Sequence, residues 1–329
     1  ANVMVQVDPD LLQLDHVHED GRVDFFIPVE EGASFKRWAK LTKLFTINHG
    51  RDKAITKDTS LKEIGNRMES SLEKFRSASP MARRAMLKEA KALIKREHNV
   101  TTLLSENGKL QKTRVNDLGL TYDDKSVASM GLGLASAQQI NEKVNTCPQR
   151  AICEGLCLGE TAGQNLLYGG SGKFRSGPRL SQFLKTEAMV MHPEQFAILL
   201  HNEIELFTKW AEKETGVEKL TDAKGQKYTA PKQVYKPAIR LNVTSDIPPD
   251  VLRSIITASP RVEFYDYTKL NGSNPIAANH HLTYSSTGAS QVVDGEEIYN
   301  KHSNWDTMVN RLMSGKNVAM AFTSRTDLP

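Results

Sequence analysis

The stretch Ala238-Ile-Arg-Leu-Asn-Val-Thr-Ser-Asp246 decides the fold that we expect for this chain. Its first six residues, 238–243, are mainly apolar and predict a short strand, which runs directly into the polar residues Thr244-Ser245-Asp246. Three later stretches repeat this arrangement of a strand followed by polar residues. They are Arg261–Tyr267 before Thr268-Lys269, His281–Tyr284 before Ser285-Ser286-Thr287, and Asn317–Phe322 before Thr323-Ser324-Arg325.

Helical patterns lie between these strands, and a Gly-rich strand, Met130–Ala135, precedes them all. Because strands that alternate with helices form parallel sheets, and because these strands are as short as those of a barrel, we predict an α/β fold over residues 129–329. The expected architecture is a partial (β/α) TIM-like barrel, left open because the chain stops just after its fifth strand. The expected helices are Pro178–Val190, Pro193–Trp210, Pro249–Ala258 and Gly295–Met313.

The polar residues after the strands predict a binding site. In a (β/α) barrel the carboxyl ends of the strands form the active face, so the five clusters should meet on one side of the sheet. We expect one cofactor-binding cavity lined by Asn242, Ser245, Asp246, Lys269 and Ser286. The alternative is that Asp246 and Ser286 only cap the helices that follow them.

All three cysteines of the 329-residue chain lie within one short stretch, Cys147, Cys153 and Cys157, spaced C-x5-C-x3-C. An odd number cannot form a complete disulfide framework. Soft thiolate ligands select zinc, copper(I) or iron–sulfur clusters, and three ligands leave one coordination position open. The alternative is a set of inert buried cysteines, which would be scattered along the chain rather than clustered. The spacing therefore favours a metal centre.

Residues 1–128 are expected to form a mainly helical region and a linker. A short strand or ordered arm is expected near the start, followed by helices from Ser34 to Phe45, Ser60 to Ser77 and Ser79 to His98, and a polar linker over 105–128. The third helix is basic and can contact the phosphates of nucleic acid. An ordinary solvated face is the favoured alternative, because nucleic-acid-binding domains usually have a much higher pI than 8.8. Its basic residues are Arg83, Arg84, Lys88, Lys91, Lys95 and Arg96.

The composition excludes several classes of protein. A hydrophobic content of 39% and a charged content of 25% are typical of a globular chain, and a net charge of +4 permits but does not require a nucleic-acid partner. No apolar run is long enough to cross a membrane, and residues 1–10 do not form a signal peptide. Cysteine thiols without an export signal predict a reducing, cytoplasmic location.

Taken together, the motifs resemble the bacteriophage gene product 88 family over residues 129–329. The members of this phage family have a barrel and a cysteine loop that are similar to those of radical S-adenosylmethionine enzymes. The motifs that carry the resemblance are Cys147-x5-Cys153-x3-Cys157-Leu158, Arg179 with Lys185-Thr186, Phe196 with Leu200–Ile204, Arg240–Asp246 and Phe264–Lys269.

The resemblance implies a [4Fe–4S] cluster on Cys147, Cys153 and Cys157, with one iron available to S-adenosylmethionine. It further implies radical-type enzymatic chemistry, through a 5′-deoxyadenosyl radical, in the cytoplasm of an infected bacterium. Radical enzymes usually have the spacing C-x3-C-x2-C and a Gly-Gly-Glu motif after the second strand, and this chain has neither. Whether S-adenosylmethionine binds is therefore left open.

Two further functions stay open. One is an iron–sulfur protein without radical chemistry, which binds nucleic acid or a phage or host protein through the helical region. The other is a zinc site in which His192 or His201 supplies the fourth ligand. His280-His281 opens a strand, where the two side chains can face the site, the solvent or the core.

Overall fold

The computed structural model describes residues 13–17, 23–26, 60–106, 121–122, 125–136, 144–148, 177–221, 226–270, 272–285, 291–293, 296–298 and 305–319. The expected helix at 34–45, and with it Cys153, Cys157 and Ser286, lies outside these residues. The chain divides into two compact units, Ala1–Asp58 with Glu160–Leu180, and Thr59–Gly159 with Ser181–Pro329. In the first unit, β1 (Gln13–Val17) and β2 (Val23–Phe26) form an antiparallel hairpin.

A mostly parallel sheet forms the centre of the second unit. Its strand order is β13-β10-β9-β8-β5-β3, so the parallel strands lie side by side in the order in which they occur in the chain. The predicted α/β class with a parallel sheet is confirmed, and the described strands form an open sheet rather than a closed barrel. The parallel strands are β5 (Lys125–Leu132), β8 (Lys236–Arg240), β9 (Glu263–Thr268), β10 (His280–Ser285) and β13 (Val318–Ala319).

Two short strands pair with β5 in the antiparallel sense. They are β3 (Leu104–Ser105), which forms one edge of the sheet, and β4 (Thr121–Tyr122). The carboxylate of Glu203 accepts hydrogen bonds from the backbone N–H groups of Leu103 and Leu104 at 2.8 to 2.9 Å, which fixes the start of β3 against a helix. Ser105 and β4 lie within residues 105–128, which the sequence predicted to be a linker.

The helices near the start of the second unit are α2 (Leu61–Ser77) and α3 (Pro80–His98), as expected. The side chains of Ser60 and Ser79 accept hydrogen bonds from backbone N–H groups in the first turns, and proline fits the first turn because its missing N–H needs no partner there. Helix α3 ends at Asn99, which adopts a left-handed conformation with φ 52°.

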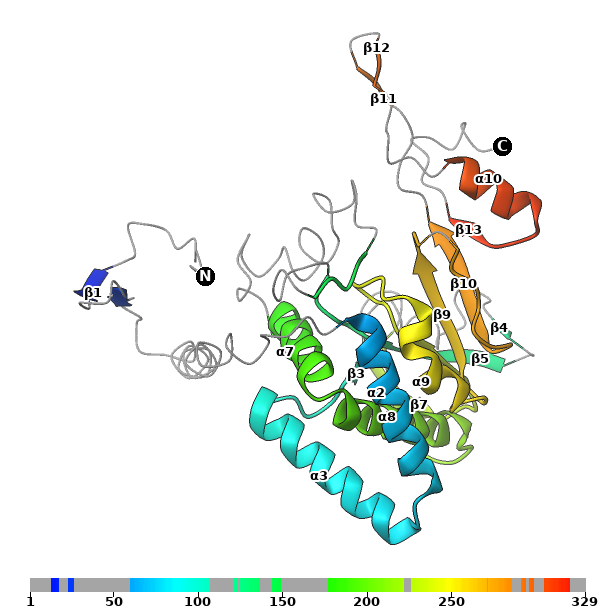
Figure 1. The fold of residues 1–329 in the computed structure, drawn as a ribbon. Helices are drawn as coiled ribbons and strands as arrows, with labels where there is room; N and C mark the ends of the chain where they lie inside the picture. Colours follow the sequence, from blue (N-terminus) through cyan, green and yellow to red (C-terminus); the bar gives the residue numbers. More distant parts are fainter. Residues whose placement is uncertain are drawn as a thin grey trace. The chain divides into compact units, whose positions relative to one another are not determined.

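The remaining helices are α7 (Gly177–Met191), α8 (Pro193–Glu212), the 3-10 helix η4 (Pro249–Leu252), α9 (Arg253–Thr257) and α10 (Trp305–Met313). Helix α2 packs on α8, where Arg67 forms a bidentate ion pair with Glu194 at 2.7 and 2.9 Å. Figure 1 shows α2, α8 and α9 on the same side of strands β9 and β10. None of the described helices has the length and apolar character needed to span a membrane.

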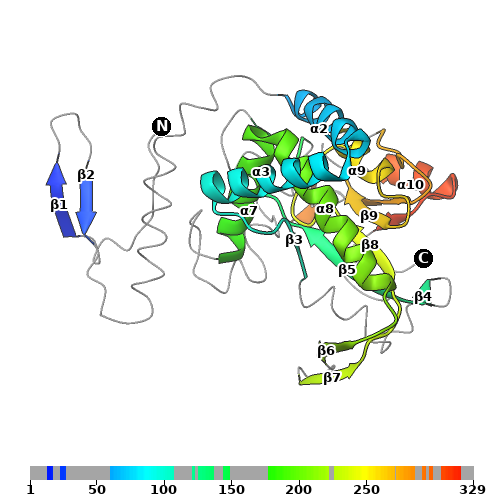
Figure 2. The ribbon, with the colours of Figure 1, turned by 90° about the horizontal axis from the view of Figure 1, so that it is seen from below.

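The expected helix Gly295–Met313 is wrong in its first part. Instead, β11 (Gln291–Val293) and β12 (Glu296–Ile298) pair as an antiparallel hairpin, and only the second part is helical. The signal is present in the sequence, because Asp294-Gly295, a dipeptide typical of two-residue hairpin turns, directly follows the β-branched pair Val292-Val293. A second hairpin, β6 (Val217–Thr221) and β7 (Lys227–Pro231), extends away from the sheet (Figure 2).

The two faces of the sheet differ in polarity. On β9, Phe264, Asp266 and Thr268 alternate onto the buried face, whose neighbours include the buried residues Ile239 and Tyr284. The other face carries Glu263, Tyr265 and Tyr267, which are only partly buried or exposed. The apolar core therefore lies between the sheet and helices α2, α8 and α9.

Candidate cofactor site at the strand ends

The first cysteine lies next to the carboxyl end of β8. The backbone N–H of Asp246 donates to the carbonyl oxygen of Thr146 at 2.9 Å, and Cys147, the next residue, is partly buried. The hydroxyl of Thr146 donates to the carbonyl of Ala135, just after β5. The start of the cysteine stretch is thus attached both to the end of the first parallel strand and to the turn after the second.

Helix α7 supports the same segment. The hydroxyl of Thr186 accepts a hydrogen bond from the backbone N–H of Ala135 at 2.8 Å and donates to the carbonyl of Gln182 in its own helix. Thr186 is completely buried, so removal of its hydroxyl would leave a buried N–H without this partner. The side chains of α7 therefore fix the backbone from which the cysteine stretch departs.

Asn242 and Ser245 build the turn after β8. The side-chain oxygen of Asn242 accepts from the hydroxyl of Ser245 at 2.9 Å and from the N–H of Ile247 at 3.0 Å, and its amide nitrogen donates to the carbonyl of Ile247 at 3.1 Å. Both side chains are buried. These polar groups hold the turn in shape, and binding of a cofactor by Asn242 and Ser245 stays a prediction.

Two carboxyl groups lie beside this turn. Asp266 on β9 accepts from the backbone N–H of Asn242 at 2.7 Å, and burial raises its pKa to about 7. Asp246 accepts from the backbone N–H of Lys269 at 2.9 Å through Oδ2, while its buried Oδ1 has no hydrogen-bond partner among the described residues. Burial also raises the pKa of Asp246. Asp246 is therefore the carboxyl group at this edge that retains an acceptor for a ligand.

The structure brings together most of the residues predicted for the site. Asn242 bonds to Ser245, and Asp246 bonds to the backbone of Lys269, in the turns that follow β8 and β9. Cys147 follows Thr146, whose carbonyl accepts from the N–H of Asp246. Ser286 follows Ser285, the last residue of β10. Binding of one metal by the three cysteines stays a prediction, since Cys153 and Cys157 are outside the described residues. Asp266 was not predicted, because in sequence it is one polar residue within an aromatic strand.

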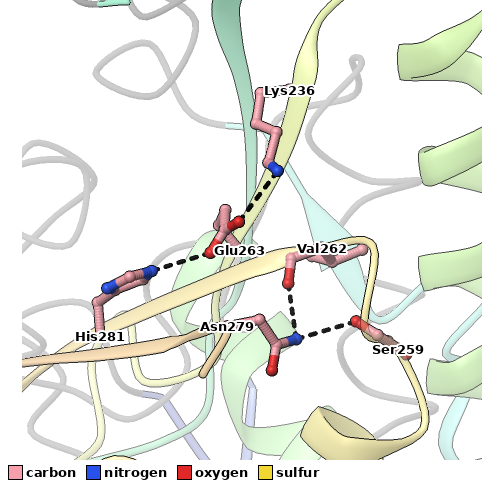
Figure 3. Close-up of polar contacts among 6 residues, drawn as sticks. All are labelled: Lys236, Ser259, Val262, Glu263, Asn279 and His281. Carbon is pink, nitrogen blue, oxygen red and sulfur yellow. Dashed lines mark hydrogen bonds and ion pairs between the residues drawn. The ribbon is translucent and has the colours of Figure 1, made fainter. Parts of the chain in front are cut away.

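A separate polar network lies at the opposite end of the strands, at the amino ends of β8, β9 and β10 (Figure 3). Glu263 pairs with Lys236 at 3.1 Å and with His281 at 2.8 Å. Burial opposes ionisation of Glu263, but the hydrogen bonds from His281 and Lys236 outweigh it and lower its pKa. Nearby, the side chain of Asn279 donates to the carbonyls of Ser259 and Val262 at 3.1 and 2.9 Å.

His280 and His281 therefore lie at the end of the sheet opposite to the cysteine segment. His280 is buried, its Nδ1 accepts from the backbone N–H of Ile276 at 3.1 Å, and burial lowers its pKa to about 4. The structure thus assigns His280 to the core and His281 to an ion pair.

The two histidines considered as zinc ligands lie in the layer of helices. The ring of His192, the N-cap residue of α8, contacts the ring of His98 with centroids 5.2 Å apart. His201 contacts Phe75 edge to face, and burial lowers its pKa. Within the described ranges, no three His, Cys, Asp or Glu side chains are grouped so that they can hold a metal.

The fold is thus a mixed α/β fold with a chain-ordered parallel sheet, and its candidate site lies at the carboxyl ends of the strands. The chain belongs to the bacteriophage gene product 88 family, whose family model, described as "Gene product 88", matches residues 93–325. This match confirms the family predicted from the motifs and extends it toward the N-terminus into helix α3. Comparisons with curated proteins and with solved structures found no match.

Proposed function

We propose that this phage protein is an iron–sulfur protein whose [4Fe–4S] cluster is held by Cys147, Cys153 and Cys157. The observation that carries the proposal is the attachment of residue 146 to the N–H of Asp246 at 2.9 Å, which puts the first thiol at the carboxyl ends of the strands. Three thiolates suit the soft irons of such a cluster and leave one iron without a protein thiolate.

The polar groups beside Cys147 support a small polar ligand at that iron. Asp246 has a carboxylate oxygen that accepts no hydrogen bond from a described residue, and Lys269 adds a positive charge next to it. Carboxylate and ammonium groups form the stronger, charge-assisted hydrogen bonds with a zwitterion such as S-adenosylmethionine. When bound, the cluster supplies one-electron chemistry. We therefore favour an enzyme of the radical S-adenosylmethionine type, with a non-catalytic iron–sulfur or zinc protein as the alternative.

Metal analysis tests this proposal. Anaerobically purified protein should contain about four iron and four sulfide per chain and absorb near 400 nm, as expected for a [4Fe–4S] cluster. Replacement of Cys147, Cys153 or Cys157 by alanine should remove most of the iron, because each thiolate is one of the cluster's three protein ligands. Thr257→Ala, which changes an exposed residue on α9, is the control and should retain full iron content. Full iron content in the triple cysteine variant would refute the cluster, and stoichiometric zinc would favour the alternative.

A second candidate function, nucleic-acid binding, is favoured by the surface of α3. Arg84, Lys88, Lys91 and Lys95 are all exposed, and their spacing of four, three and four residues places them on one side of the helix. By contrast, Arg96 pairs with the adjacent Glu97 at 2.9 Å, and Arg83 donates to the carbonyl of Ala78. We propose that the four-residue stripe contacts phosphates of DNA or RNA.

Salt-dependent binding distinguishes this stripe from an ordinary solvated face. Replacement of Arg84, Lys88, Lys91 and Lys95 by glutamine should weaken binding to duplex DNA and reduce the slope of log K against log salt by about 3 to 4, because four phosphate contacts are lost. The matched control replaces four exposed cations elsewhere, namely Lys62, Lys74, Arg76 and Lys209. Equal slopes in the two variants would identify the stripe as a solvated surface.

A further inference from the structure

The face of the sheet that is turned away from the core carries three residues that the proposed cluster and its ligand do not use, Arg240, Tyr265 and Tyr267. Tyr265 and Tyr267 on β9 alternate onto this face, and Arg240 on β8 lies beside Tyr265, because Ile239 pairs with Phe264 in the sheet register. On the other side of Arg240, its partner in β5 is Gly131, which has no side chain. Gly131 is itself buried, so no side chain of β5 competes for the guanidinium group at this register position.

Arg240 is fixed in position but keeps most of its donors. Its Nε donates to the carbonyl of Asn242 at 3.0 Å, and its guanidinium carbon lies 5.0 Å from the centre of the Tyr267 ring. No carboxylate among the described residues forms an ion pair with Arg240, and no described residue accepts a hydrogen bond from its two terminal nitrogens. Asp266 attracts Arg240 electrostatically but forms no hydrogen bond or ion pair with it, so the two terminal nitrogens can bind an external anion.

Two neighbouring hydroxyl groups add one neutral donor, because one of their two protons is used in the bond between them. The hydroxyls of Tyr265 and Ser129 are hydrogen-bonded at 2.8 Å, across the intervening strand β8. Burial raises the pKa of Tyr265, so its phenol stays neutral and able to donate. Tyr267, with 45% of its surface exposed, offers a ring against which a ligand can pack.

The charge of the surroundings favours a doubly charged anion. Lys269 follows directly after β9, two residues beyond Tyr267, and adds a second positive charge to this part of the fold. The acidic residue on the same face, Glu263, is already paired with Lys236 and His281 at the other end of the strands. A phosphate monoester carries about −1.5 to −2 charges at neutral pH and fits the planar fork of arginine.

We propose that Arg240, with Tyr265, Tyr267 and Lys269, forms a binding site for the phosphate group of a small phosphate ester. The site lies on the face of the sheet opposite to helices α2, α8 and α9, shares Lys269 with the ligand proposed at the cluster, and requires no cluster on the cysteines. It therefore goes beyond the proposed iron–sulfur function and can hold whether or not the cluster exists.

Calorimetric titration of the anaerobically purified full chain tests the site with three probes, namely adenosine monophosphate, inorganic phosphate and uncharged adenosine. At least one phosphate probe should bind, and it should bind at least tenfold more tightly than adenosine. Arg240→Gln should weaken that binding at least tenfold, because charge-assisted hydrogen bonds are lost. The matched control is Arg261→Gln, which removes the same charge from an exposed arginine paired with Glu212.

Further variants keep the test decisive if Arg240→Gln does not fold. Lys269→Gln should weaken phosphate binding severalfold, and Tyr267→Leu should weaken binding of adenosine monophosphate more than Tyr267→Phe, which keeps the ring. Cys147→Ala should leave phosphate binding unchanged while its iron content falls, which separates this site from the cluster. The proposal is overturned if neither phosphate probe binds more tightly than adenosine, or if all the Arg240, Lys269 and Tyr267 variants bind as the Arg261 control does.

Discussion

Two buried residues on the core side of the sheet, Asp266 and His280, titrate in opposite senses. Burial raises the pKa of Asp266 to about 7, so the stability that it contributes is complete below its unfolded value of about 3.9 and is lost as the pH rises through 7. Burial lowers the pKa of His280 to about 4, so its contribution is complete above about 6.5 and is lost as the pH falls through 4. Between about pH 4 and 6.5 the two dependences oppose each other.

The substitution Asp266→Asn should show how much Asp266 contributes to the pH dependence of stability. It removes the proton binding of the carboxyl group but keeps a side-chain oxygen that can accept from the N–H of Asn242. The free energy of unfolding of the variant, relative to the wild type, should therefore rise by about 1.4 kcal/mol per pH unit between about pH 4 and 7. Urea denaturation at several pH values measures this difference. Asp250→Asn, at a side chain that is 73% exposed, should give a parallel curve. If the free energy of unfolding of Asp266→Asn changes with pH as that of the wild type does, the pKa of Asp266 is not raised.

The site shows which single residues could be predicted from the sequence. Asn242, Ser245, Asp246 and Lys269 were expected together, because polar residues that follow neighbouring parallel strands must meet at one edge. Their separate roles could not be predicted, because only the bonds of the Asn242 amide to Ser245 and Ile247 show that it shapes the turn. Asp266 could not be predicted because its burial depends on which face of β9 meets the core.

At the scale of the elements, the ends of the helices were predicted best. Ser60, Ser79 and Pro80 are local signals that act within one turn, so α2 and α3 begin where the sequence indicates. What these helices pack against is not a local property. The sequence predicted a mainly helical region over residues 1–128 but not its contacts, and α2 contacts α8, α9 and η4 within the unit that contains the sheet.

Gly65 is the residue at which α2 approaches η4 most closely. A Cβ atom at this position would lie 3.0 Å from the Cα atom and 3.2 Å from the carbonyl oxygen of Val251. In an exposed helix, Gly→Ala stabilises by about 1 kcal/mol. Here the added methyl group would push apart two elements that are distant in sequence, so Gly65→Ala should instead destabilise by about 1 to 3 kcal/mol.

Chemical denaturation of Gly65→Ala measures this packing, and Asn66→Ala on the exposed side of the same turn is the control. The control should be neutral or stabilised by a few tenths of a kcal/mol, because only the helix propensity changes there. Stabilisation of Gly65→Ala by the full propensity difference would show that α2 does not pack closely on η4 in solution.

At the scale of the whole molecule, the alternation of strands and helices predicted the parallel sheet but not the strand that forms its edge. The strands follow one another across the sheet in chain order, as they do in a (β/α) barrel. The antiparallel edge strand β3 could not be predicted, because two residues carry no periodicity and the strand depends on Glu203 far along the chain. The hairpin of β11 and β12 was missed although its turn signal was readable.

The proposed cluster should also stabilise the second unit, because the cysteine segment is attached to the sheet. The cysteine segment is bonded to the turns after both β5 and β8, so a metal centre that orders this segment must bind the folded state far better than the unfolded one. Binding energy that is available only to the folded chain adds to its stability. A gain of about 3 kcal/mol corresponds to a rise in Tm of about 6 to 12 °C for a unit of this size.

Differential scanning calorimetry under anaerobic conditions should therefore show a higher Tm after reconstitution with iron and sulfide than after removal of the metal. The triple variant of Cys147, Cys153 and Cys157 to alanine should have the same Tm with and without reconstitution, because it lacks the ligands that connect the metal to the fold. Reconstitution with zinc is the second comparison, since a zinc site would raise Tm without absorption near 400 nm. If the wild-type protein takes up iron but its Tm does not change, the metal binds outside the part of the chain that unfolds cooperatively. The proposed link between the cysteine stretch and the sheet would then be wrong.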